Sequence, residues 1–436
     1  MFIYNLRLAL VSLKRDPVLT ALMIGAIAVG IGMSTTTLAI YHSMSNDPIA
    51  YKSDQLYAVQ LDNWSPDAPY DEPNEPPTQV TYLDAMALMR AAKAEHQNVS
   101  FKAALTLQTD NPAIKPDLKL ARVTYKDFFG MFDVPFQYGG PWDKAADDGG
   151  QQVVVVSQET NEKLFGGGNS VGKEITLNNR RFRIVGVLGK WEPSPKFYDL
   201  ENGSFEDMED VYIPFSLTVP MELHSTGNNS CWGAPKDNSF QGYLNSECVW
   251  IQAWAELSTP AARADYHQYL DGYVQEQKKL GRFARPLNNH LRDVDEWLKY
   301  NKVVSKDSKA LVGLSFMFLA VCMLNTIGLI LAKFLRRSNE IGLRRALGAS
   351  RLALFRQYLV ETSVVGVSGG LLGLGLGWLG LLGVRQLISD SSRIAHLDWT
   401  MVGVSLLLAV VASMLAGLYP AWRVVRIPPA IYLKIQ

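Results

Sequence analysis

Four long apolar segments, spaced very unevenly, constrain the fold of this 436-residue chain more than any other feature. One lies at 18–40, and three follow residue 309, at 310–332, 358–388 and 399–419. About 20 consecutive apolar residues allow a helix to cross a bilayer. The segments therefore predict four membrane spans, with one large soluble domain inserted after the first.

The expected fold class is an α-helical membrane protein with four transmembrane helices and a large α+β extracytoplasmic domain between helices 1 and 2. The first span has a basic start. We favour an uncleaved span over a signal peptide, because its apolar run is too long and no small-residue cleavage site follows. The predicted boundaries are an interfacial amphipathic helix at 1–16, transmembrane helix 1 at 17–43, the α+β domain at 44–307, transmembrane helix 2 at 308–334, a basic loop at 335–351, transmembrane helix 3 at 352–388, a short outer loop at 389–398, transmembrane helix 4 at 399–420 and a tail at 421–436.

Charge is divided between these regions. Residues 44–310 hold 27 basic and 37 acidic residues, whereas the rest of the chain holds 15 basic and 5 acidic residues. Lys and Arg collect before the first span, between the second and third, and after the fourth, which is typical of cytoplasmic segments. Both termini and the 335–351 loop are therefore expected in the cytoplasm and the acidic domain outside. This division argues against a nucleic-acid binder.

The three cysteines fit the same division. Cys322 lies inside the second span, where it is a small apolar residue. Cys231 and Cys248 both lie in the inserted domain, and an oxidising compartment favours a disulfide between them. Such a bridge would stabilise the domain by about 3 kcal/mol on the chain-entropy model. The alternative is two thiols too far apart to join.

The inserted domain shows alternating strand and helix patterns. Strands are expected at 56–61, 153–156 and 211–215, a hairpin at 175–177 and 182–188, and helices at 82–95, 157–165, 260–277 and 293–302. We expect the last of these helices to lead directly into the second span, and most acidic side chains to form a solvated face.

No catalytic motif is visible. Residues 167–174 resemble a phosphate-binding loop, but Glu174 stands where a magnesium-binding Ser or Thr is required. We interpret this run as a turn between a helix and a strand. The six histidines show no metal-binding spacing. We therefore expect neither enzyme activity nor a cofactor or metal bound by this chain.

The most specific signal lies at 334–361. Ser338 or Asn339 can cap a short helix in which Glu340 precedes Arg344 by four residues, a favourable ion-pair spacing. Gly348 can end this helix in the left-handed conformation, and Ser350 can cap the third span. A short charged helix should therefore project from the membrane. The spacing alone does not decide between a partner-docking helix and a basic loop that anchors neighbouring helices to lipid headgroups.

The run at 339–351, with Gln357 and Glu361, resembles the signature of MacB/FtsX-like permeases of ABC transporters, although Asn339 replaces the family's usual Arg. The tail at 418–423, with 427–430, is similar to the Tyr-Pro-Ala-x-Arg ending of that family. Segments 121–129 and 161–186 resemble its periplasmic core domain.

The resemblance implies that this chain is an inner-membrane permease subunit with a periplasmic domain. The short helix would be the coupling helix, which contacts a cytoplasmic ABC ATPase dimer on a separate chain. ATP and magnesium would bind to that ATPase. Further expected partners are the bilayer and a second permease, either an identical copy or a paralogue, while a periplasmic adaptor and an outer-membrane channel are left open. The expected ATPase-coupling residues are Glu340, Ile341, Arg344, Arg345, Ala346, Leu347 and Gly348.

Small residues in the spans predict close helix packing. The glycines concerned are Gly366, Gly369, Gly370, Gly373 and Gly377. We expect them to favour contact between two permeases, with packing inside one chain as the alternative. Glu361 is an ionisable residue near the start of a span, where a charge is costly unless it is paired or near the interface. We expect it either to meet Arg356 or an arginine of the short helix, or to reach the interface as a purely structural carboxylate.

The implied function is mechanotransmission: ATP-driven motion inside the cell changes the periplasmic domain, which drives substrate export. Two alternatives remain. One is a lipoprotein-releasing permease, and the other is an FtsX-like regulator of periplasmic partners that transports nothing. FtsX-like outer domains are much smaller than residues 44–307, which disfavours the second alternative.

Overall fold

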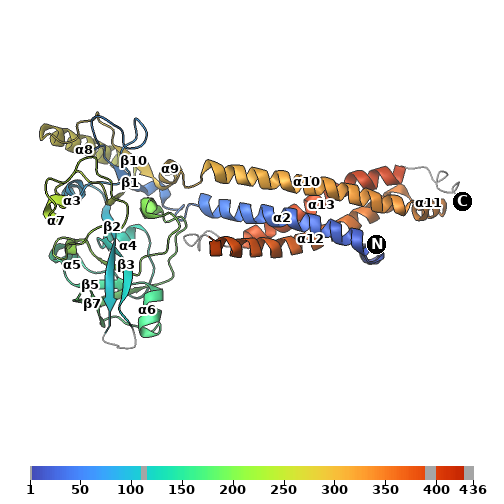
Figure 1. Ribbon diagram of the computed structural model, residues 1–436, viewed down its shortest axis with the longest axis horizontal. Coiled ribbons are helices and arrows are strands. Elements are labelled where there is room, and N and C mark those ends of the chain that lie inside the picture. The colour runs from blue at the N-terminus through green and yellow to red at the C-terminus, as the bar shows by residue number, and fades with distance from the viewer. Residues whose placement is uncertain (1, 110–114, 388–398, 427–436) are drawn as a thin grey trace. The chain divides into compact units, whose positions relative to one another are not determined.

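The computed structural model describes residues 2–109, 115–387 and 399–426. The chain divides into two compact units (Figure 1). Met1–Ser45 and Val304–Gln436 form the first unit, here called the membrane domain. Asn46–Val303 form the second, here called the α+β domain.

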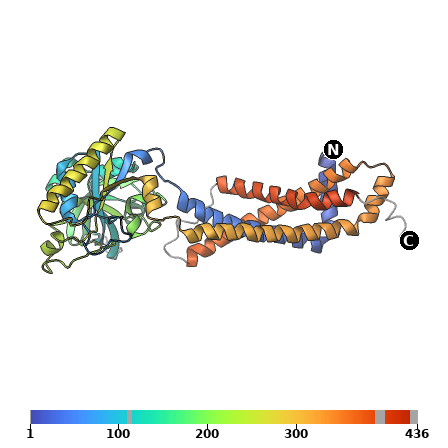
Figure 2. The ribbon, with the colours of Figure 1, turned by 90° about the horizontal axis from the view of Figure 1, so that it is seen from above.

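Four helices of the membrane domain are long and apolar enough to cross a bilayer. They are α2 (Pro17–Ser45), α10 (Lys306–Arg336), α12 (Arg351–Leu387) and α13 (Trp399–Arg426). The helices run side by side (Figure 2), and Ile27 and Ile31 of α2 are buried in a shared core with Leu319 of α10 and Ala409 of α13. The predicted fold class, with four spans and the α+β domain between the first and second, is confirmed.

Two shorter helices, α1 (Phe2–Arg15) and α11 (Ser338–Ala346), lie at the same end of the membrane domain (Figures 1 and 2). The predicted tail at 421–436 begins as helix, because α13 continues to Arg426. The predicted outer loop at 389–398 and the tail beyond residue 426 lie outside the described residues.

Glycines let these helices approach closely. A Cβ atom built on Gly369 would lie 2.7 Å from the side chain of Ile27, and one on Gly373 would lie 2.9 Å from that of Ile31. Gly377 faces Thr35 of the same helix α2. Gly366 and Gly370 instead face Ser413 and Ala409 of α13. All five glycines thus pack within this chain, as the alternative expected, and their contact with a second permease stays a prediction.

The α+β domain is built on a ten-stranded sheet in the order β10-β1-β9-β2-β3-β8-β5-β7-β4, with β6 beside β2 and β7. Most neighbours are antiparallel, but the β3–β8 and β5–β7 pairs are parallel. The strands are β1 (Leu56–Gln60), β2 (His96–Gln108), β3 (Asp117–Thr124), β4 (Phe136–Gly139), β5 (Val153–Val156), β6 (Glu174–Leu177), β7 (Arg180–Leu188), β8 (Val211–Pro214), β9 (Gln252–Glu256) and β10 (His290–Asp293).

Helices cover both faces of the sheet, so a strand such as β5 is buried along its whole length. Because successive side chains of a strand point to opposite faces, Val154 and Val156 belong to one core and Val153 and Val155 to the other. The helices are α3 (Tyr82–Ala91), α4 (Asp127–Met131), α5 (Lys144–Gly149), α6 (Gln158–Phe165), α7 (Phe240–Leu244), α8 (Pro260–Lys279) and α9 (Val294–Tyr300), with 3-10 turns η1 (Ser53–Gln55), η2 (Phe197–Asn202) and η3 (Phe215–Leu217).

The segment 157–188 follows its prediction closely. Ser157 caps α6 by accepting a hydrogen bond from the backbone of Thr160, and Gly166 ends the helix in the left-handed conformation. The run that imitates a phosphate-binding loop is a turn between α6 and β6, as interpreted from the sequence. β6 and β7 form the predicted hairpin across Asn178 and Asn179, which both have positive φ.

Helix α9 does not run into the second span, contrary to expectation. It ends at Tyr300, and Lys302 adopts a positive φ of 52° that breaks the helix. Ser305 then caps α10 by accepting a hydrogen bond from the backbone of Ser308 at 3.0 Å. Two independently capped helices therefore replace the continuous one expected from the apolar pattern.

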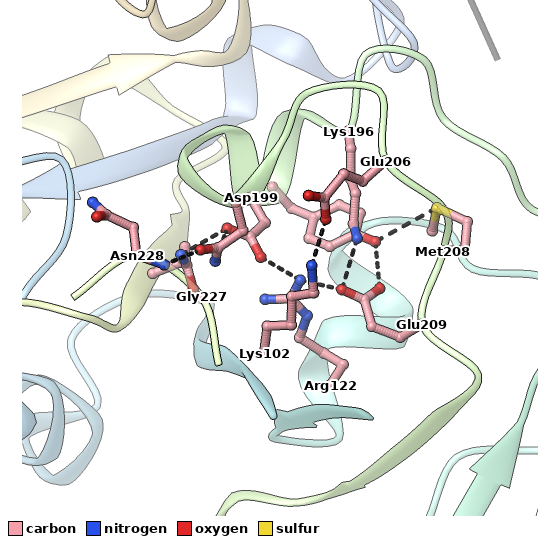
Figure 3. A network of polar contacts seen from close by, with 12 residues as sticks. Lys102, Arg122, Lys196, Asp199, Glu206, Met208, Glu209, Gly227 and Asn228 are labelled. Atoms are coloured by element: carbon pink, nitrogen blue, oxygen red, sulfur yellow. Dashed lines mark hydrogen bonds and ion pairs between the residues drawn. The ribbon is translucent and has the colours of Figure 1, made fainter. Parts of the chain in front are cut away.

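A group of buried, charged side chains connects the irregular segment around η2 to the sheet (Figure 3). Arg122 of β3 is fully buried and forms ion pairs with Asp199 and Glu209, which are also fully buried. Lys196 lies 2.8 Å from Glu209, so two cations face two carboxylates. Burial would raise the pKa of Glu209, but Arg122 and Lys196 outweigh burial and hold that pKa well below its ordinary value.

Neutral groups complete this charge cluster, defined as Arg122, Lys196, Asp199 and Glu209. Tyr198 donates to Glu209 at 2.9 Å, and Gln252 of β9 donates to Asp199 at 2.7 Å. Carboxylates without such partners would be very costly to bury. The expectation that most acidic residues form a solvated face therefore fails at these positions.

Cys231 and Cys248 are joined by a disulfide bond. Next to it, Ser230 and Val249 exchange backbone hydrogen bonds at 3.1 and 2.9 Å. The bridge therefore ties an irregular segment to residues that lead into β9.

Candidate coupling site at the short helix α11

Helix α11 is a compact unit between two long helices. It begins at Ser338, and its N-cap position is Arg337, which makes no side-chain capping bond. The expected Ser338 or Asn339 cap is therefore wrong, because α11 begins one residue after α10 and Arg337 serves as the end of both helices. Gly348 adopts a φ of 96°, as predicted. Ser350 accepts a hydrogen bond from the backbone of Ala353 at 3.2 Å, which caps the start of α12.

Charged side chains brace α11 on one side. Arg344 lies 2.6 Å from Glu340, which is the predicted i,i+4 pair. Arg344 also donates to Gln357 of α12 at 3.2 Å. Glu340 in turn lies 3.3 Å from Arg15 of α1. Ion pairs this exposed contribute little to stability. They do connect α11 to α1 and α12 on one side of the helix.

Two leucines project from α11 without cover in this chain. The side chains of Leu343 and Leu347 are 54% and 80% exposed, and they are four residues apart, hence neighbours on the helix surface. Arg345 is half-buried and Gly348 is exposed. Ile341 and Ala346 lie on the same helix, but their side chains are outside the described part of the chain. The expected coupling residues thus occupy one short helix and its C-terminal turn.

Glu361 does not meet the expected arginines. Its carboxylate is buried and lies 2.6 Å from the ammonium of Lys333, near the end of α10. The Ser12 hydroxyl of α1 donates to the same carboxylate at 2.5 Å. The prediction of Arg356 as the partner is therefore wrong. Arg356 is exposed, whereas a buried carboxylate pairs with a cation that is buried beside it.

Sequence reasoning missed Ser12, Lys333 and Arg337. The signal for Lys333 was available, since a lysine at the end of an apolar span needs a partner as much as Glu361 does. Nothing in the pattern around Ser12 distinguishes it from an ordinary small residue of an amphipathic helix.

Over the described ranges, no group of three or more His, Cys, Asp or Glu side chains is arranged to hold a metal ion. The described part of α11 presents two exposed leucines beside paired charges.

Both domains match known protein families. Residues 20–265 match the family described as the MacB-like periplasmic core domain, and residues 312–429 match the family described as the FtsX-like permease C-terminal. The first match alone covers more than half of the chain.

Individual relatives are distant. The chain is 22% identical to the uncharacterized ABC transporter permease YknZ of Bacillus subtilis, over 66% of this chain and 62% of the relative. It is 25% identical to the pyoverdine export ATP-binding/permease protein PvdT of Pseudomonas aeruginosa, over 71% and 41%. It is 22% identical to the macrolide export ATP-binding/permease protein MacB of Pasteurella multocida, over 95% and 56%. The chain thus spans between 41% and 62% of the length of these relatives.

Among solved structures, the periplasmic region of MacB from Actinobacillus actinomycetemcomitans is similar, with 14% identity and a TM-score of 0.36. That alignment covers 57% of this chain and 92% of the solved one.

Proposed function

Because this chain belongs to the MacB-like family of ABC transporter permeases, we propose that it is the membrane subunit of an ABC exporter and that α11 docks on a partner ATPase. ATP and magnesium bind to the partner, and this chain performs no chemistry. The relatives' names as ATP-binding/permease proteins support an ATPase partner for this permease.

The observation that carries this proposal is the exposed leucine pair on α11. An apolar side chain that is 80% exposed, as Leu347 is, gains stability by burial against another protein. Glu340 contacts Arg15 of α1 and Arg344 contacts Gln357 of α12, whereas both leucines are exposed. A loop that only anchored its neighbours to headgroups would not need a helix that ends at a glycine in the left-handed conformation.

The helices on either side of α11 support mechanotransmission as the mechanism of this proposal. The 31-residue helix α10 is about 46 Å long at 1.5 Å per residue, and α12 is longer. Close glycine contacts bind α12 to α2. A displacement of α11 would therefore move whole helices, and α10 begins three residues after the α+β domain ends. The substrate would be driven onward by the α+β domain.

Orientation in the membrane rests on charge. Arg344 and Arg345 follow the second span, whereas the α+β domain is net acidic. Since cytoplasmic segments collect Lys and Arg, we place α11 and both termini in the cytoplasm and the α+β domain in the periplasm of a bacterial inner membrane.

The test is recovery of the ATPase. Affinity purification of the detergent-solubilised chain, followed by mass spectrometry, should identify a nucleotide hydrolase. Leu347→Asp should reduce its recovery at least tenfold, because a carboxylate would have to be desolvated in the contact.

Leu280→Asp is the matched control, since Leu280 is 74% exposed but lies in the α+β domain. It should recover as much ATPase as the unaltered chain. Equal recovery with Leu347→Asp, or no hydrolase with the unaltered chain, would refute the proposed function.

A further inference from the structure

Helix α1 is bonded to the joint between α10 and α11. The Arg337 guanidinium, at this joint, donates to the Ser12 carbonyl at 2.8 Å and lies 2.6 Å from the Asp16 carboxylate just after α1. Its side chain is only 15% exposed, so these bonds are largely shielded from water. The joint is therefore fixed to α1 by two bonds from one arginine.

The same turn of α1 is bonded to α12. Arg337 also donates to the Ser12 hydroxyl, and that hydroxyl donates to Glu361 of α12 at 2.5 Å. Lys333 of α10 lies 2.6 Å from the same carboxylate. Ser12 thus connects three helices, and its side chain and its carbonyl are both engaged.

Packing agrees with these bonds. Ala9, Ser12 and Leu13 are buried, and Ser12 and Leu13 lie three and four residues after Ala9, so all three share one face of α1. Val11, Lys14 and Arg15 are exposed. The described part of α1 therefore has its inner face seated on the membrane domain. The interfacial helix predicted from the amphipathic pattern has a second, inward role in the structure.

We propose that α1 is part of the coupling unit, acting as a clamp that makes α11 and α12 move together when the ATPase moves α11; this rests on the proposed function. Ser12, Asp16, Arg337 and Glu361 are the positioning residues. Without the clamp, α11 is joined to α12 by its own connecting turn and by half-buried polar contacts such as Arg344–Gln357. A push on α11 would then bend that connection instead of displacing α12.

The arrangement of charge explains why the clamp is in α1. Glu361 and Lys333 are both almost fully buried, so their pair resists separation. Ser12 gives that buried pair a hydrogen-bonded link to Arg337 at the joint. An exposed ion pair such as Arg15–Glu340, with side chains 71% and 40% exposed, could not carry a displacement equally well.

The experiment compares Ser12→Ala and Asp16→Asn with Lys14→Gln, a matched control on the exposed side of the same turn. The full chain carries Cys322→Ala and nitroxide labels at Leu324 of α10 and Leu372 of α12, whose side chains are 66% and 58% exposed. The complex with its copurified ATPase is measured with and without ATP and vanadate, for ATPase recovery and for the distance between the labels.

We expect Ser12→Ala and Asp16→Asn to keep ATPase recovery within twofold of the unaltered chain and to at least double the ATP-dependent distance change, because α10 would then move relative to α12. Lys14→Gln and the conservative Ser12→Thr should match the unaltered chain in both measurements. If Ser12→Ala and Asp16→Asn show only the distance change of the unaltered chain, the clamp is refuted and the proposed function stands. If they already alter the distance without ATP and lose the ATPase, Ser12 and Asp16 only support the fold. If the unaltered chain recovers no ATPase, the proposed function fails and the clamp with it.

Discussion

At the scale of single residues, the sequence does not reveal which charged side chains of the α+β domain are buried and paired. Arg122 sits in a strand and Glu209 in an irregular segment, 87 residues apart, and neither has a local pattern that marks it as buried. Only the fold brings them together. Asp147 of α5 is another buried carboxylate, and it has no cationic side chain as an ion-pair partner among the described residues.

Asp147 should make the stability of the α+β domain depend on pH. Burial raises its pKa from 3.8 to about 6, although Trp142 donates to the carboxylate at 2.6 Å. Because the folded state then binds more protons than the unfolded state between these values, the free energy of unfolding should fall as pH rises from about 4 to about 6. This change in the pKa of Asp147 corresponds to a loss of roughly 3 kcal/mol in the free energy of unfolding once the pH is well above both pKa values.

Asp147→Asn keeps an oxygen that can accept from Trp142 but removes the charge. Melting curves of the full chain in detergent, followed by tryptophan fluorescence, should show this variant gaining stability relative to the unaltered chain as pH rises from 4.5 to 7.5. Asp148→Asn is the control, because the Asp148 side chain is 64% exposed. Parallel pH profiles of Asp147→Asn and the unaltered chain would contradict the assignment.

At the scale of elements, the glycines of α12 give the sharpest prediction. Gly373→Leu would force a side chain into Ile31 and the carbonyl of Ala28, which lie 2.9 and 3.0 Å from the added Cβ. Overpacking of this kind costs about 1–3 kcal/mol. Gly373→Leu should therefore lower the melting temperature of the membrane domain and the yield of monodisperse protein in size-exclusion chromatography.

Gly375→Leu is the matched control, since nothing lies within 4 Å of a Cβ at Gly375 two residues away. It should behave like the unaltered chain. Equal losses in both variants would mean that leucine itself, and not contact with α2, disturbs the helix.

Elements with a strong local signal could be predicted from the sequence. The β5–α6 segment is an example, because Ser157 and Gly166 mark the ends of its helix. The long strand β2 was missed, since it mixes residues such as His96, Asn98 and Lys102 with apolar ones, and its pairing with β9, β3 and β6 decides its conformation. In the candidate site, helix α11 and the Glu340–Arg344 pair were predictable from spacing. The Ser12–Glu361 contact was not, because it joins positions 349 residues apart.

At the scale of the whole molecule, the order of the candidate spans predicts that α11 and the α+β domain face opposite sides of a membrane. Residues 46–303 precede the second candidate span and α11 follows it, so one predicted crossing separates them. With Cys322→Ala as background, a membrane-impermeant maleimide applied to spheroplasts should label Lys144→Cys, whose side chain is 78% exposed. It should not label Leu347→Cys until detergent is added. Labelling of Leu347→Cys alone in intact spheroplasts would reverse the orientation.

The charge cluster between β3 and η2 has a consequence for how this domain can vary among homologous chains. Exchanging Arg122 alone would leave Asp199 without a cationic partner in a dry interior, and exchanging Glu209 alone would leave Lys196 without a carboxylate partner. Exchanging all four residues for well-packed apolar side chains can instead be neutral or favourable. Homologues should accordingly either keep all four residues of the charge cluster or replace all four. Chains that replace only some of them should be rare.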